Sequence, residues 1–195
     1  MKTVSEREIL LTGIGGQGVQ LAAKVLALAA TFEELEVMSL GTYGGTMRGG
    51  NTDATVVIGR GPILAAPIVS RAWSAIVVHP RYFDPLRARL REDALVVVDA
   101  DLLDEDFPQV PGECVRIEAT RLSRDVDAPK SAALVLLGAY VAITGIVSHD
   151  CLEQALEAAL PSYRQQTLDA NRRALQMGRE AVRPLSTPAW TTKAA

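Results

Sequence analysis

The sequence has few cysteines, no strong excess of charge of either sign and no long hydrophobic run. Cys114 and Cys151 are the only cysteines in 195 residues. Two thiols cannot supply the four ligands of an iron–sulfur cluster or of a structural zinc site. We therefore expect no metal on this chain and two reduced thiols in a cytoplasmic protein.

The charge balance argues against a nucleic-acid-binding surface. Lys and Arg number 20 and Asp and Glu number 23, which gives a net charge of −3 at pH 7. A protein with a large nucleic-acid footprint is normally basic. The sequence predicts no nucleic-acid partner.

The longest apolar run, residues 132–147, contains Gly138, Thr144 and Gly145. It is shorter than the roughly 20 residues that a membrane-spanning helix needs. We expect a helix buried between layers or at a subunit contact, and a contact between two copies of the chain would use the same surface. The start of the chain, MKTVSEREILL, has neither the uninterrupted apolar stretch nor the cleavage site of a secretory signal. The sequence thus predicts no membrane association.

Strands and helices alternate along the first two thirds of the chain. The pattern predicts strands over 9–12, 36–40, 53–58, 74–78, 94–98 and 114–117, and helices over 19–31, 84–91, 131–144, 150–160 and 164–183. Unbroken apolar strands are typical of a parallel sheet that is covered on both faces. We predict a Rossmann-like α/β fold with a largely parallel sheet, helices on both faces and a helical C-terminal third. Residues 1–183 form a single domain, and residues 184–195 form a flexible tail.

A first glycine loop joins the strand 9–12 to the helix 19–31. Gly13, Gly15 and Gly18 match the pattern G-x-G-x-x-G, with Gly16 and Gln17 between them. Such a loop lets the backbone approach a phosphate, next to the positive end of the following helix. A dinucleotide site also expects an acidic residue at the end of the second strand, and none stands there. Two interpretations remain, namely a phosphate site for a ligand other than NAD, or glycines that only allow close helix packing.

A second glycine-rich loop spans residues 41–51 and includes Tyr43, Arg48, Gly49 and Gly50. Because it follows a strand, a parallel sheet places it at the carboxyl edge beside the first loop, where ligands of open α/β folds bind. Arg48 can hold a phosphate or carboxylate, and Tyr43 can stack on a ligand. The alternative is a surface loop in which Arg48 forms an ordinary salt bridge.

The two motifs together resemble the gamma subunit of the 2-oxoacid:ferredoxin (acceptor) oxidoreductases, the pyruvate, 2-oxoglutarate, ketoisovalerate and indolepyruvate enzymes. The motifs are Gly-Ile-Gly-Gly-Gln-Gly-Val at 13–19 and Tyr-Gly-x-x-Met-Arg-Gly-Gly at 43–50. Later segments fit as well, including Leu-Gly-Ala at 137–139, Thr-Gly-Ile-Val-Ser at 144–148 and Asn-x-x-Ala-x-x-x-Gly at 171–178. The resemblance covers about residues 7–183.

The resemblance implies a heteromeric complex that converts a 2-oxoacid and CoA to acyl-CoA, CO2 and a reduced acceptor. Thiamine diphosphate would sit on the alpha and beta subunits, and [4Fe-4S] clusters on the beta or a ferredoxin-like delta subunit. The gamma chain would contribute contacts to CoA and to assembly, without catalysis of its own. Its site residues would be a phosphate cradle and a loop facing ligand or partner: Gly13, Gly15, Gly16, Gln17 and Gly18, and Tyr43, Arg48, Gly49 and Gly50.

Two departures from the family pattern stand out. Gly45-Thr46 occupies the place where many members have Pro-Glu, and Ala133 the place of an asparagine. Two other functions remain as alternatives, a stand-alone nucleotide or CoA-ester binding protein and a purely structural subunit.

Four other polar residues receive structural interpretations. We interpret His79 as a helix-capping residue, Asp99 and Asp101 as a turn signal rather than a Mg²⁺ site, and Ser131 as a helix N-cap.

Overall fold

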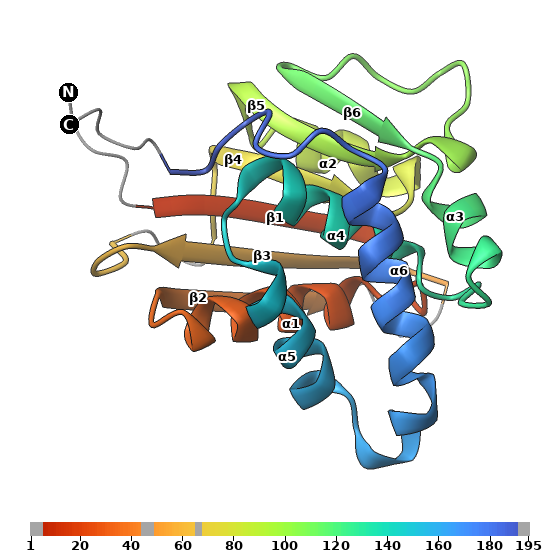
Figure 1. The fold of residues 1–195 in the computed structure, drawn as a ribbon. Coiled ribbons are helices and arrows are strands. Elements are labelled where there is room, and N and C mark those ends of the chain that lie inside the picture. Colours follow the sequence, from red (N-terminus) through yellow and green to blue (C-terminus); the bar gives the residue numbers. More distant parts are fainter. Residues whose placement is uncertain (1–5, 44–48, 65–67, 191–195) are drawn as a thin grey trace.

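The computed structural model describes residues 6–43, 49–64 and 68–190, which form one six-stranded sheet with helices packed on it (Figure 1). The strand order is β2-β3-β1-β4-β5-β6. The strands are β1 (Glu6–Ile14), β2 (Glu36–Tyr43), β3 (Asn51–Gly59), β4 (Ala72–Val77), β5 (Leu90–Asp99) and β6 (Glu113–Ile117). All six strands lie where the apolar runs of the sequence predict them.

The sheet is largely parallel, with one exception. β1, β4, β5 and β6 pair in parallel, whereas β3 runs antiparallel to both β1 and β2. Residues 44–50 connect β2 to β3 and are too few for a crossover, since a parallel connection needs a dozen or more residues. The predicted Rossmann-like α/β fold is confirmed, and β3 departs from it for this reason.

The two faces of the sheet are covered unequally. One carries α1 (Val19–Phe32), α3 (Ala119–Asp125), α4 (Ala132–Thr144), α5 (His149–Ala159) and α6 (Leu168–Glu180). The other carries the short helix α2 (Phe83–Arg87) and two 3-10 turns, Pro80–Tyr82 and Ala100–Leu102. The helix predicted over 84–91 is too long, because β5 already begins at Leu90.

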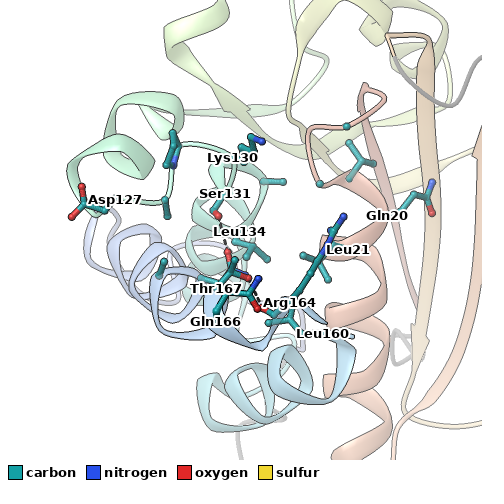
Figure 2. A pocket seen from close by; sticks show the side chains of 18 of the residues that line it. Gln20, Leu21, Asp127, Lys130, Ser131, Leu134, Leu160, Arg164, Gln166 and Thr167 are labelled. Carbon is teal, nitrogen blue, oxygen red and sulfur yellow. Dashed lines mark hydrogen bonds between the residues drawn. The ribbon is translucent and has the colours of Figure 1, made fainter. Parts of the chain in front are cut away.

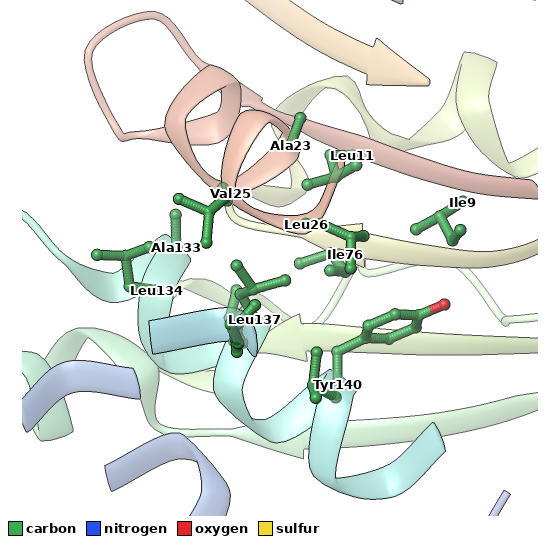
Figure 3. Packing of buried hydrophobic residues seen from close by; sticks show 14 of the residues in the cluster. Ile9, Leu11, Ala23, Val25, Leu26, Ile76, Ala133, Leu134, Leu137 and Tyr140 are labelled. Atoms are coloured by element: carbon green, nitrogen blue, oxygen red, sulfur yellow. The ribbon is translucent and has the colours of Figure 1, made fainter. Parts of the chain in front are cut away.

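Helix α4 is the centre of the larger core. Every residue from Ala133 to Thr144 is buried, and its side chains meet those of α1 and the sheet (Figure 3). The Tyr140 hydroxyl shares a 2.8 Å hydrogen bond with Ser74 on β4, which satisfies both buried groups. Of the two interpretations of residues 131–147, the structure shows the helix buried between layers of one chain. Within the described residues, no helix combines the length and hydrophobicity needed to cross a bilayer.

Helices α4 and α6 approach each other closely at two glycines. A side chain on Gly138 would overlap the Leu175 backbone, and one on Gly178 would overlap the Val135 backbone. Small residues therefore set the distance between these helices, as close-packed interiors require.

The C-terminal segment, residues 184–190, packs against the end of α4. The amides of Leu185, Thr187 and Ala189 donate to the carbonyls of Ala142, Ile143 and Thr144. The Trp190 indole donates to the Ile146 carbonyl at 3.1 Å and lies under the Arg60 guanidinium. These bonds satisfy carbonyls that a helix end leaves without partners. The prediction of a flexible tail is therefore wrong for residues 184–190, while residues 191–195 lie outside the described residues.

Candidate functional site

The first glycine loop connects β1 to α1 and contains two glycines with left-handed backbone. Gly16 has φ 101° and Gly18 has φ 87°, a region that other residues enter at a cost. Gly18 is also the N-cap of α1, without a side-chain cap. Gly13 is different, because a side chain there would press on Val19 and Val78. Gly13 therefore serves close packing, whereas Gly16 and Gly18 shape the turn itself.

The Gln17 side chain closes the loop on itself. Its Oε1 accepts a 2.9 Å hydrogen bond from the Ile14 backbone amide, and the backbone amide of Gln17 donates to the Ile14 carbonyl at 3.1 Å. The backbone amides of Ile14 and Gln17 are thus used inside the loop and do not donate to a phosphate. The first turn of α1 keeps its amides without intrahelical acceptors, as at any helix start.

The two glycine loops lie together, as the sequence predicts. The Gly15 amide donates to the Gly50 carbonyl at 2.8 Å, and the Gly49 amide donates back to the Gly15 carbonyl at 3.3 Å. The pairing follows from β3, whose first residue Asn51 stands opposite Ile14. Arg48 lies outside the described residues, and Tyr43 is placed only as the last backbone position of β2.

A cavity of about 1050 Å³ opens beside the first loop (Figure 2). Its walls are the loop and first turn of α1, the start of α4, the start of α6, and the 3-10 turn Ser162–Thr167. Lys130 and Arg164 extend from different walls. In the described part of the chain neither cation lies within 4 Å of a carboxylate. The cavity therefore offers two unneutralised positive charges to a ligand.

Three helix starts point toward this cavity, those of α1, α4 and α6. None of them has a side-chain capping bond. Ser131 stands at the N-cap position of α4, as predicted, but its hydroxyl donates to Asn171 Oδ1 at 2.7 Å and not to an amide of the helix. Asn171 Nδ2 donates in turn to Thr167 Oγ1 at 3.2 Å. The bond between Ser131 and Asn171 therefore joins the start of α4 to α6. The positive ends of three helices add to the charge of the two cations.

Thr52 contributes a buried hydroxyl that has no partner. This β3 residue is 4% exposed and lines the cavity, and its Oγ1 makes no hydrogen bond within the described structure. A buried polar atom of this kind is uncommon in a folded protein and is normally satisfied by water or a ligand. Sequence analysis missed both Thr52 and Arg164, because neither stands in a glycine motif. The Thr52 hydroxyl is therefore a candidate contact for a ligand in this cavity.

The remaining polar positions are structural. His79 Nδ1 accepts the Arg81 amide at 3.2 Å and caps the turn Pro80–Tyr82, as predicted. Asp99 is buried and accepts the amides of Asp101, Ala119 and Thr120. Burial raises the pKa of this carboxyl group, and the hydrogen bonds oppose that shift. Asp99 therefore connects β5 to α3, which confirms the turn interpretation.

Fold and cavity together are those of a Rossmann-like α/β protein with a ligand-sized cavity at the carboxyl edge of its sheet. The family model described as Pyruvate ferredoxin/flavodoxin oxidoreductase matches residues 8–181, and the chain belongs to this family. The resemblance predicted from the two glycine motifs is thereby confirmed.

One relative and two solved structures match this chain over almost their whole length. The chain is 32% identical to the 2-oxoglutarate synthase subunit KorC of Methanocaldococcus jannaschii, over 92% of this chain and 95% of the relative. A keto/oxoacid ferredoxin oxidoreductase gamma subunit from Geobacter sulfurreducens superimposes with a TM-score of 0.76 at 29% identity, covering 90% of this chain and 97% of that one. The pyruvate oxidoreductase subunit PORC from Thermotoga maritima gives 0.74 at 27% identity, covering 92% and 98%.

Proposed function

We propose that the chain is the gamma subunit of a 2-oxoacid:acceptor oxidoreductase and is not catalytic alone. The complex would convert a 2-oxoacid and CoA to acyl-CoA, CO2 and a reduced acceptor. The observation that carries the proposal is the match, over nearly the full length of both chains, to a 2-oxoglutarate synthase subunit and to a keto/oxoacid ferredoxin oxidoreductase gamma subunit. A chain that corresponds to one subunit from end to end supports the role of that subunit.

The proposal assigns thiamine diphosphate and the [4Fe-4S] clusters to alpha, beta and ferredoxin-like delta subunits in the cytoplasm. This chain would hold the phosphate side of CoA, whose thiol accepts the acyl group. The cavity fits such a ligand because Lys130 and Arg164 supply charge, and Thr52 supplies a buried hydroxyl without a partner. Gly16 and Gly18 shape the loop that admits a phosphate, and the second glycine loop adjoins it.

The decisive experiment is anaerobic affinity purification of the chain from its own host, followed by native mass spectrometry and an acceptor-reduction assay. The expected result is a complex with larger subunits that reduces an acceptor only when a 2-oxoacid and CoA are both present. The isolated chain should be inactive. Recovery of the chain only as a monomer or homodimer, even under gentle conditions, would contradict the proposal and favour a stand-alone binding protein.

A further inference from the structure

Strand β2 has one free edge along its whole length. It pairs with β3 on one side from Glu36 to Tyr43, and no described strand lies on the other side (Figure 1). Its outward amides and carbonyls therefore have no strand partner. Such an edge is a template for another extended segment.

The side chains of β2 do not protect this edge. Proteins usually guard a free strand with lysine, proline, a bulge or a covering loop. β2 contains neither lysine nor proline, and its pairing with β3 is regular from end to end. Leu40 is 40% exposed, and Phe32 at the end of α1 is 44% exposed. The edge thus combines free backbone groups with apolar side chains in solvent.

Negative charge gathers where β2 begins. Glu33, Glu34 and Glu36 follow the C-terminal end of α1, which is the negative end of that helix. In the described residues no Lys or Arg lies within 4 Å of these three carboxylates, and the one bond to them comes from the Ser148 amide to Glu33. Uncompensated charge beside a free edge favours a partner of positive charge.

We infer that β2 receives an extended, basic segment of another subunit of the complex, which adds to the sheet as a further strand. The inference rests on the proposed function, since it takes the partner from that complex. Backbone hydrogen bonds along β2 would hold the segment, Leu40 would be covered, and a Lys or Arg at one end would face the glutamates. Strand addition of this type derives affinity from the main chain and specificity from side chains.

A second copy of this chain fits the edge less well. The only charged residue of β2 is Glu36, so a second β2 brings no cation to the carboxylates. An eight-residue edge also buries little surface compared with the 1,200–2,000 Å² typical of stable interfaces, roughly counted over both partners. A segment of another subunit does not need to bind through this edge alone, because other interfaces of the complex also hold that subunit in place.

The test uses the purified complex and two variants of the chain. Glu36→Lys combined with Leu40→Lys places positive charge on the edge, and Glu105→Lys makes the same kind of charge change at an exposed position beyond β5. Thermal unfolding of each isolated chain shows that both variants fold. Native mass spectrometry then gives the fraction of each chain that enters the complex at equal concentration and salt.

The expected result is at least a tenfold loss of assembly for the edge variant and none for Glu105→Lys. Hydrogen exchange should show β2 amides that are protected in the complex and unprotected in the isolated chain. Carbodiimide coupling should join Glu34 or Glu36 to a lysine of a partner subunit.

Normal assembly of the edge variant, equal exchange of β2 amides in both states, or coupling only between two copies of this chain would each overturn the inference. In those cases the wild-type complex still forms, so the proposed function survives. A wild-type chain that enters no complex would overturn both.

Discussion

Arg7 donates a 2.6 Å hydrogen bond from Nε to the carbonyl of Ala189, joining residues that are 182 positions apart. The guanidinium is buried and lies 4.2 Å from the centre of the Trp73 ring. The N-terminal end of β1 and the C-terminal segment therefore meet at one buried charge, which also lies over the face of Trp73.

Deleting residues 184–195 should destabilise the fold substantially. The deletion removes three backbone hydrogen bonds to α4, the Arg7 bond and the indole bond of Trp190. At about 1 kcal/mol for each bond, the free energy of unfolding should fall by about 3–5 kcal/mol. Urea denaturation measures the change. Trp190→Phe loses only the indole bond and some packing, so it should lower the free energy of unfolding by about 1 kcal/mol. Equal stability of the wild type, the deletion and Trp190→Phe would show that this segment does not stabilise the fold.

Gly138→Ala and Gly178→Ala should each force α4 and α6 apart. A single methyl group at either position overlaps the backbone of the other helix, and backbone cannot move aside as a flexible side chain can. We expect losses of at least about 2 kcal/mol in unfolding free energy. Gly61→Ala is the control, because its added methyl group meets nothing within 4 Å. Equal melting temperatures for Gly138→Ala and the control would refute the close helix contact.

His149 should make stability depend on pH. Burial, together with Arg179, lowers the pKa of His149 to about 4, against the opposing effect of Asp150. The unfolded chain takes up a proton near pH 6.5 and the folded chain does not, so stability is full above pH 6.5 and falls as the pH drops toward 4. The loss should be on the order of 2–3 kcal/mol. Denaturation at several pH values should show a flatter profile for His149→Gln, and parallel profiles would count against this role.

Thr52→Val should separate binding from stability. Valine keeps the shape of threonine and removes the buried hydroxyl that has no partner. The free energy of unfolding of the isolated chain should stay equal or rise by up to about 1 kcal/mol. In the assembled complex the KM for CoA should rise. A stable variant with unchanged KM would remove Thr52 from the proposed site.

Lys130→Ala and Arg164→Ala should weaken the interaction with CoA without unfolding the chain. Both side chains are exposed and form no salt bridge in the described residues, and Arg164 contacts the exposed ring of Tyr163, so their loss costs little stability. Each charge-assisted contact to a phosphate is worth about 1.5–3 kcal/mol, which corresponds to roughly a 10- to 100-fold rise in KM. Arg183→Ala removes an exposed arginine away from the cavity and serves as the control. A rise in KM of the same size in the control would indicate a general effect of charge.

Much of the fold could be predicted because it depends on local patterns. The glycine turn between β1 and α1 and the apolar runs of β4 and β5 are visible in the sequence alone. The antiparallel direction of β3 was missed, although residues 44–50 are too few for a crossover, and this shortness was the available signal. The C-terminal segment shows no hydrophobic periodicity because it is held by its backbone amides. Backbone hydrogen bonds do not depend on the residue type, so the sequence does not reveal them.

The candidate site was predictable only in part. The two glycine loops meet because β3 pairs with β1. The sequence predicts that the loops are adjacent for another reason, namely that a loop after a strand lies at the carboxyl edge of a parallel sheet. Arg164 reaches the same cavity from the turn after α5, far along the chain. Thr52 becomes a candidate only because its hydroxyl is buried without a partner in the described structure. Gln17 was predicted as a contact to a ligand, yet its amide oxygen holds the loop closed. These roles arise from tertiary packing, which no sequence motif describes.

The C-terminal segment also constrains how the chain is made. Helix α4 is among the most apolar parts of the protein, and the carbonyls at its end receive their partners from residues 185–189. These residues follow every strand and helix of the sheet in chain order, so translation, which proceeds from the N-terminus, makes them after α4. A chain synthesised only as far as α6 therefore holds an apolar helix whose end is incompletely covered. Completion of the fold waits for residues 185–189 and not only for the sheet.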